Sequence, residues 1–287
     1  MKAAQVSDIV YLNGDWVTGN NSKVSVFDRG FLFADGVYEV IPVYQRRPFL
    51  PELHIQRLQR SADAIGIAPI ATEFWHQLVL DLIQRNDLDD CLVYIQLTFG
   101  ADSQRSHLPT QPLTPTIYAS LSPLRVHWNT PSPVKVAVLE DIRWQRCDIK
   151  SISLLGNIML KREAAKRGAF EPLLHRNGRI TEGASCNYFM VKQGLLYTPP
   201  ADHLILAGIT RTWVIQLARQ LEIEVHEEAI DVNELQHVDE VFLTSSSREV
   251  QPVGQIDDII VGNGQCGAIT AQIAEAFHAS KRHLIQE

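Results

Sequence analysis

Cysteine is scarce in this 287-residue chain, and its few cysteines form no recognisable pattern. No C-x-x-C pair occurs, and the four thiols lie far apart at Cys91, Cys147, Cys186 and Cys266. Structural zinc sites and disulfide-rich domains need closely spaced cysteines, so both are disfavoured and no metal is expected. The pattern indicates a protein of the reducing cytoplasm.

Long hydrophobic runs and clusters of positive charge are also missing. No apolar run approaches the ~20 residues of a membrane span, and residues 1–8 are too polar for a signal peptide, so we expect neither membrane insertion nor export. The 26 basic residues are outnumbered by 33 acidic ones, and no basic cluster is long enough to follow a phosphate backbone. Nucleic acid is therefore not an expected partner.

The composition that is present is typical of a folded protein. Hydrophobic residues make up 45% of the chain and charged residues 21%, and the length allows one or two domains. Six prolines between residues 109 and 133 mark a break. We predict an α/β (α+β) protein with a small N-terminal α/β domain (1–124), a linker (125–133) and a larger C-terminal domain (134–287).

Hydrophobic periodicity places most of the expected elements. In the first domain we predict a hairpin over residues 9–17 around Asn13-Gly14, helices over 53–65 and 74–84, and strands over 91–99 and 117–121. In the second we predict a strand over 134–139, a hairpin over 188–197, and helices over 154–167, 210–221 and 268–279.

Lys150 is the first candidate for chemistry. Most lysines are solvent-exposed, but this one stands in the apolar-rich stretch Ile149-Lys150-Ser151-Ile152-Ser153-Leu154. A charged amine in such surroundings is costly unless it is paired or its pKa is lowered, and a lysine with a lowered pKa suits Schiff-base chemistry.

Three further segments have both an ordinary and a functional interpretation. Gly208-Ile209-Thr210 precedes an amphipathic helix, so it is either a simple helix cap or a phosphate site at the helix N-terminus. The hydroxyl run 244–247 is either a polar turn or a second phosphate contact. Glu182 is either a hairpin carboxylate in solvent or a buried functional acid.

The order of several motifs along the chain resembles the fold-type IV pyridoxal-phosphate aminotransferases. The resemblance covers nearly the whole chain and rests on Phe27-Asp28-Arg29-Gly30, Asp35-Gly36-Val37-Tyr38-Glu39, His54-x-x-Arg57, Asp148-Ile149-Lys150-Ser151, Thr181-Glu182-Gly183 and Gly208-Ile209-Thr210-Arg211. It implies a two-domain fold whose C-terminal domain is a pseudo-barrel that binds the cofactor. It also implies a homodimer with the active site at the subunit interface.

The resemblance assigns roles residue by residue. Lys150 would form the Schiff base with pyridoxal 5'-phosphate and move the α-proton, and Glu182 would face the pyridine nitrogen. The phosphate would be held by Arg57, Ile209, Thr210 and Ser246. Arg57 has the ordinary alternative of a solvent-facing helix residue, as has Arg60.

The segment after residue 100 sets the expected substrate. Its Arg105-x-His107 is similar to the substrate-carboxylate trap of bacterial D-amino acid aminotransferases, which would work with Tyr38. We therefore expect amino transfer from D-alanine, D-glutamate or similar donors to 2-oxo acids. An exposed basic loop tip is the ordinary alternative. The family alternatives are branched-chain L-amino acid aminotransferase, (R)-amine transaminase and 4-amino-4-deoxychorismate lyase.

Overall fold

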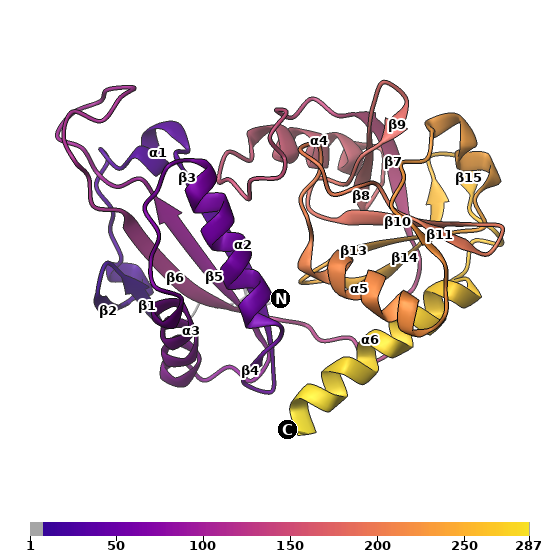
Figure 1. The fold of residues 1–287 in the computed structure, drawn as a ribbon, viewed down its shortest axis with the longest axis horizontal. Coiled ribbons are helices and arrows are strands. Elements are labelled where there is room, and N and C mark those ends of the chain that lie inside the picture. Colours follow the sequence, from indigo (N-terminus) through magenta and orange to yellow (C-terminus); the bar gives the residue numbers. More distant parts are fainter. Residues whose placement is uncertain (1–7, 287) are drawn as a thin grey trace. The chain divides into compact units, whose positions relative to one another are not determined.

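The chain folds into two compact units, which the computed structural model describes for residues 8–286 (Figure 1). The first unit includes residues up to Val126 together with Ile149–Ser153, and the second holds His127–Asp148 and Leu154 onward. The domain limits expected from the sequence stay a prediction. They differ from the units in two respects. The expected linker 125–133 is divided between the two units, and residues 149–153 lie in the expected second domain but pack with the first unit.

The first unit is an antiparallel sheet of six strands in the order β2-β1-β6-β5-β3-β4. Two helices, α2 (Pro51–Ala64) and α3 (Thr72–Arg85), pack on it, and the short α1 (Arg29–Phe33) precedes the longest strand. The strands are β1 (Ile9–Leu12), β2 (Asp15–Thr18), β3 (Gly36–Tyr44), β4 (Arg47–Pro48), β5 (Cys91–Thr98) and β6 (Thr116–Pro123). A 3-10 helix, η1, covers Gly19–Asn21.

Strand alternation decides which side chains enter the core of the first unit. Along β5 the inward positions are apolar, and they pack with the inner faces of α2 and α3. The opposite face carries the neighbours Tyr38, Tyr94 and Tyr118, whose rings follow one another across β3, β5 and β6. One face of this sheet thus builds the core, while the other presents polar aromatic side chains.

The second unit is a nine-stranded sheet in the order β12-β11-β10-β13-β14-β7-β8-β9, with β15 pairing to β14. Its parallel pairs are β14 with β7, β7 with β8, and β11 with β12. The strands are β7 (Val134–Glu140), β8 (Glu171–Arg176), β9 (Arg179–Ile180), β10 (Asn187–Lys192), β11 (Leu195–Tyr197), β12 (Val225–His226), β13 (Glu240–Ser245), β14 (Glu249–Ile256) and β15 (Ile259–Ile260). They form the sheet of a half-barrel.

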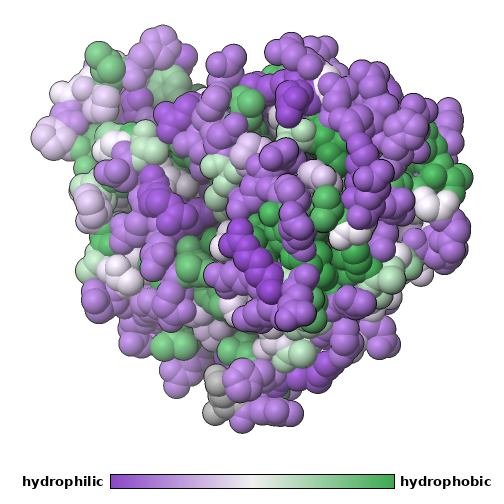
Figure 2. Space-filling model, turned by 45° about the vertical axis from the view of Figure 1, so that its right-hand side comes forward, coloured by the Kyte–Doolittle hydropathy of each residue, from purple (hydrophilic) through white to green (hydrophobic). Residues whose placement is uncertain are grey.

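Three helices complete the second unit, with a 3-10 helix, η2 (Val232–His237). The helix α4 (Leu155–Lys166) packs on β7 and β8, while α5 (Ile209–Gln220) and α6 (Ala268–Gln286) pack on each other and on β13. The rings of Phe189 and Phe242 stack at 4.9 Å in the buried part of this unit. Apolar side chains collect in such cores. In agreement with this, most of the surface seen in Figure 2 is hydrophilic.

The secondary structure expected from the sequence agrees well with the structure. The hairpins over 9–17 and 188–197, the strands predicted over 91–99, 117–121 and 134–139, and four of the helices are confirmed to within a few residues. The last helix, expected to end near Ala279, continues to Gln286. Within residues 8–286, no helix is both long and apolar enough to cross a membrane.

Candidate active site

Lys150 is held by its backbone against β3 and α2. Its N–H donates to Oγ of Ser61 at 3.1 Å, and its carbonyl accepts from the N–H of Tyr38 at 2.9 Å. The Nζ atom lies 4.2 Å from the centre of the Tyr38 ring, and within residues 8–286 it makes no hydrogen bond or ion pair. The half-buried amine is therefore presented over an aromatic face without a carboxylate partner.

Arg57 is buried on the inner face of α2, where it contacts Glu39 of β3. Its Nε and Nη2 atoms lie 2.9 and 2.6 Å from the Glu39 carboxylate, which His54 also contacts at 3.0 Å. Burial opposes ionisation of Glu39, but the charges of Arg57 and His54 outweigh it and hold the pKa of that carboxyl well below its ordinary value. Arg60 is exposed, so the solvent-facing alternative holds for Arg60 and is wrong for Arg57.

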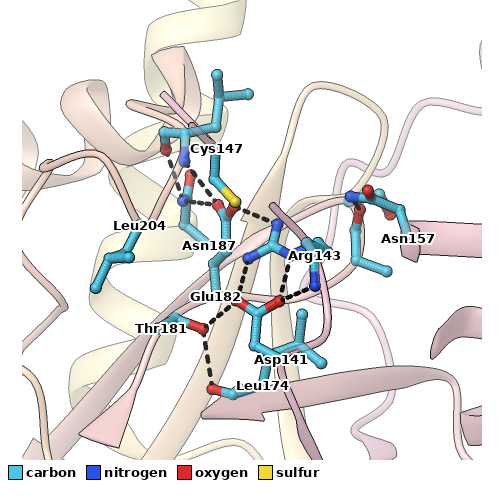
Figure 3. Close-up of polar contacts among 12 residues, drawn as sticks. Asp141, Arg143, Cys147, Asn157, Leu174, Thr181, Glu182, Asn187 and Leu204 are labelled. Atoms are coloured by element: carbon cyan, nitrogen blue, oxygen red, sulfur yellow. Dashed lines mark hydrogen bonds and ion pairs between the residues drawn. The ribbon is translucent and has the colours of Figure 1, made fainter. Parts of the chain in front are cut away.

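Glu182 is the centre of a buried polar cluster in the second unit (Figure 3). One oxygen accepts from Nη1 of Arg143 at 2.6 Å, and the other accepts from Nδ2 of Asn187 at 3.0 Å and from the N–H of Leu206 at 3.1 Å. Burial raises the pKa of Glu182 to about 7, although Arg143 opposes this shift. The alternative of a carboxylate in solvent is therefore wrong.

A second layer of charge fixes Arg143. Its Nε and Nη2 atoms donate to Asp141 (Figure 3). Arg176 donates to the same carboxylate at 3.1 Å. Sequence reasoning missed both Asp141 and Arg143. The signal was an acid and a base two residues apart directly after a buried strand, where charges need partners.

Asn187 connects Glu182 to the segment that leads into α5. Nδ2 of Asn187 donates to the carbonyl of Leu206 as well as to Glu182, and its Oδ1 lies 2.0 Å from where a β-carbon on Gly208 would stand. Gly208 is the N-cap residue of α5 and offers no side chain to cap it, so the first N–H groups, at Ile209 and Thr210, are left for another acceptor.

Ser246 lies in the tight turn between β13 and β14. Two residues earlier, Thr244 pairs with Asn187 across the sheet, and its buried hydroxyl has no hydrogen-bond partner in the part of the chain that the structure describes. The fold therefore brings Glu182, the start of α5 and this turn to one end of the β10 and β13 pair. Buried polar groups without partners are typical of a ligand site.

These groups fit pyridoxal phosphate chemically. A free amine suits the aldehyde, a buried carboxylate suits the pyridine nitrogen, and an uncapped helix start with hydroxyl side chains suits a phosphate. Cys186 is buried near this end of the sheet, and burial raises the pKa of its thiol to about 12. The thiol is therefore protonated at neutral pH and unreactive.

Arg105 and His107 lie on the loop after β5, and both contact the ring of Phe33. The Arg105 guanidinium lies 5.1 Å from the centre of the Phe33 ring, and the His107 ring lies 5.6 Å from it. Tyr38 lies instead beside Lys150, and no contact within the described residues joins it to this pair. The structure thus brings two of the three expected carboxylate contacts together in the first unit.

Comparison with known proteins identifies the family. Residues 36–256 match the family described as Amino-transferase class IV, which is most of the chain. The chain belongs to the class IV aminotransferases. The expectation of a fold-type IV aminotransferase is thereby confirmed.

The relatives of this class IV aminotransferase include D-alanine aminotransferases and branched-chain aminotransferases. D-alanine aminotransferase from Staphylococcus epidermidis is 40% identical over 270 residues, covering 93% of this chain and 96% of the relative. Among solved structures, branched-chain amino acid aminotransferase from Escherichia coli has a TM-score of 0.89 and 28% identity, covering 95% and 94% of the two chains. The branched-chain enzyme of the archaeon Thermoproteus uzoniensis, solved with norvaline, has a TM-score of 0.86 and 29% identity, covering 98% and 95%.

Proposed function

We propose that this class IV aminotransferase transfers the amino group of D-amino acids, such as D-alanine or D-glutamate, to 2-oxo acids. The observation that carries the proposal is the pair Arg105 and His107, two basic side chains gathered around Phe33. The 40% identity to a D-alanine aminotransferase supports it, since the branched-chain structure from Escherichia coli is only 28% identical.

Pyridoxal 5'-phosphate is the cofactor of the proposed reaction, and when bound it supplies a sink for the electrons released as the Cα–H bond breaks. Lys150 holds the cofactor through its Nζ atom and then moves the proton to and from the substrate Cα. Glu182 would face the pyridine nitrogen, with Arg143 and Asn187 fixing its two oxygens. The phosphate is assigned to Arg57, the amides of Ile209 and Thr210, the Thr210 hydroxyl, and Ser246.

Substrate handedness follows from where the carboxylate is held. Arg105 and His107, with Tyr38, grip the α-carboxylate by charge-assisted hydrogen bonds. With the carboxylate on that side, the Cα–H of a D-amino acid points toward Lys150, whereas an L-amino acid places its side chain there. This orientation of the substrate therefore selects one enantiomer.

A homodimer is part of the proposal, because the loop with Arg105 and His107 would serve the partner subunit's active site. Large apolar side chains on the first unit are exposed at Val26 (62%), Phe31 (69%) and Leu108 (77%). Such surfaces in a soluble enzyme commonly mark a subunit contact. We also place the enzyme in the reducing cytoplasm, since its four cysteines are unpaired.

Half-reaction spectroscopy tests the proposed function. Holoenzyme without an amino acceptor is mixed with D-alanine or with L-leucine, and the visible absorption of the cofactor is followed. We expect D-alanine to convert the cofactor to its pyridoxamine form and L-leucine to leave it unchanged. Conversion by L-leucine alone would reject the D-specific function and favour the branched-chain one.

A further inference from the structure

We propose that Arg29 is a positioning residue that holds the Arg105–His107 pair in place for the substrate carboxylate. The inference rests on the proposed function, in which Arg105 and His107 bind the substrate carboxylate and must therefore be placed accurately. Arg29 follows Asp28, the N-cap of α1, and belongs to no part of the cofactor site described above.

The contacts of Arg29 reach two consecutive carbonyls of the loop. Its Nη1 atom donates to the carbonyl of Ser106 and its Nη2 atom to the carbonyl of His107, both at 2.8 Å. Its Nε atom donates to Asp35 at 2.7 Å, and the side chain is 6% exposed. A planar guanidinium matches two neighbouring acceptors, which the single ammonium group of a lysine cannot do.

The loop is anchored at its base independently of Arg29's side chain. Ala101 bridges to Asp28, and Asp102 accepts from the N–H and the hydroxyl of Thr110, which closes the loop. From residue 103 to 109, however, the two bonds from Arg29 are the hydrogen bonds that link the tip to the rest of the first unit, as far as the structure describes it. Without them, only ring contacts to Phe33 would hold the tip, and its conformational freedom should increase.

Phe33 completes the arrangement on the same short helix. The guanidinium groups of Arg29 and Arg105 lie 5.0 and 5.1 Å from the centre of its ring, and His107 contacts it too. Arg29 is paired with Asp35, whereas Arg105 makes no ion pair within residues 8–286. Arg29 is therefore engaged in structural contacts, whereas the Arg105 guanidinium is available to bind an anion.

The test compares Arg29→Lys and Arg29→Met with the matched control Arg46→Met. Arg46 also donates to two backbone carbonyls of the first unit, those of Ile83 and Asn86, away from the loop. We expect both Arg29 variants to raise the KM for D-alanine about tenfold or more, to change kcat less, and to reduce the preference for D- over L-alanine. Arg46→Met should leave all three at the wild-type level.

Hydrogen–deuterium exchange of residues 103–109 in the holoenzymes gives a second readout. It should rise in the Arg29 variants and stay unchanged in Arg46→Met. If Arg29→Met folds poorly, the double variant Arg29→Met/Asp35→Asn removes the carboxylate left without its partner. The inference would be overturned if the Arg29 variants had the KM, the enantiomer preference and the hydrogen–deuterium exchange of the wild type.

The two proposals fail in different ways. A wild-type enzyme that does not act on D-alanine rejects the proposed function. The exchange measurement still decides whether Arg29 holds the tip, because it needs no substrate.

Discussion

Glu182 is a carboxylate that the fold holds close to its protonation midpoint. Three donors, from Arg143, Asn187 and Leu206, favour its charged form, while burial favours the neutral form and raises its pKa to about 7. Such a balance suits a group that must face the pyridine nitrogen of a cofactor and keep a proton there. The same balance has a measurable effect on stability.

In the cofactor-free protein, Glu182→Gln should remove a pH dependence of folding stability. The folded pKa of about 7 lies above the ordinary 4.5, so the wild type is favoured at low pH and loses up to about 3 kcal/mol relative to the variant as pH rises through this range. Chemical denaturation between pH 4 and 8 (roughly the window set by the two pKa values) measures the difference. Parallel stability curves for the two proteins would contradict it.

Single residues were predictable where a motif carried them. Lys150 and Glu182 stand in segments that resemble known family motifs, whereas Arg143 and Asp141 stand in none and reach partners far along the chain, at Glu182 and Arg176. A charge usually indicates an exposed position, and only the fold reveals that these are buried in pairs. Arg29 stands in a recognised motif too, but its acceptors lie 77 and 78 residues away.

Among the elements, the start of α5 is constrained by the absence of a side chain at Gly208. A β-carbon there would stand 2.0 Å from Oδ1 of Asn187 and would displace the amide that donates to Glu182. We expect Gly208→Ala to raise the dissociation constant for pyridoxal phosphate about tenfold or more, measured by titrating the cofactor-free protein.

The control for Gly208→Ala is Gly168→Ala, at the end of α4. Gly168 has a φ of +68° and open space around it, so alanine costs about 1–2 kcal/mol of backbone strain there and touches no site residue. Its affinity for the cofactor should equal that of the wild type. Equal affinities for all three proteins would show that the α5 start has no part in binding.

The helix α6 is tied to β14 by a buried ion pair. Lys281 is fully buried and donates to both oxygens of Glu249 at 2.8 and 2.6 Å and to the carbonyl of His127. Glu249 has a φ of +57° directly after the turn that holds Ser246. The C-terminal part of α6 therefore stabilises the β13–β14 turn through Glu249.

Replacing Lys281 with methionine should destabilise the protein by roughly 3–5 kcal/mol, since it removes the cation that donates to both oxygens of the buried Glu249. Lys281→Met/Glu249→Gln should recover part of the loss. Lys192→Met, which breaks an ion pair to Glu234 at the surface, should have little effect. Denaturant unfolding compares the four proteins, and a Lys281→Met variant as stable as Lys192→Met would refute the expected support.

Helices and strands were predictable where their apolar residues recur regularly, but not where their burial depends on a partner distant in the sequence. The amphipathic α2, α3 and α5 show clear apolar faces, but the predicted α6 is too short because Lys281, Arg282 and His283 interrupt its apolar pattern. The strand β3 was not predicted, since Glu39 stands within it and its burial depends on the distant partners Arg57 and His54. The helix α1 is too short, at five residues, for a periodic signal.

For the whole molecule, the arrangement of the active site predicts complementation between inactive subunits. If the Arg105 loop serves the partner subunit, a mixed dimer of Lys150→Ala and Arg105→Ala chains has one site with both residues intact. Random mixing makes half the dimers mixed, each with one of two sites restored, so about a quarter of wild-type activity should return at limiting D-alanine. A mixture as inactive as its components would mean that the loop acts within its own subunit.

The division into two compact units shows why Lys150 could be singled out from its motif while its surroundings could not be predicted. The segment 149–153 lies within the second half of the sequence, yet it pairs with β3 and α2 of the first unit. Composition and proline spacing suggest where a chain divides into domains. They cannot show that a segment beyond the boundary packs with the first domain.

The measurement that tests the account most directly is borohydride reduction of the purified holoenzyme, followed by proteolysis and mass spectrometry. We predict that a reduced B6 adduct is found on the peptide that contains Lys150, and that prior incubation with D-alanine removes most of this labelling. Recovery of Lys150 unmodified, with the adduct on another lysine or with no B6 compound in the protein, would contradict the account.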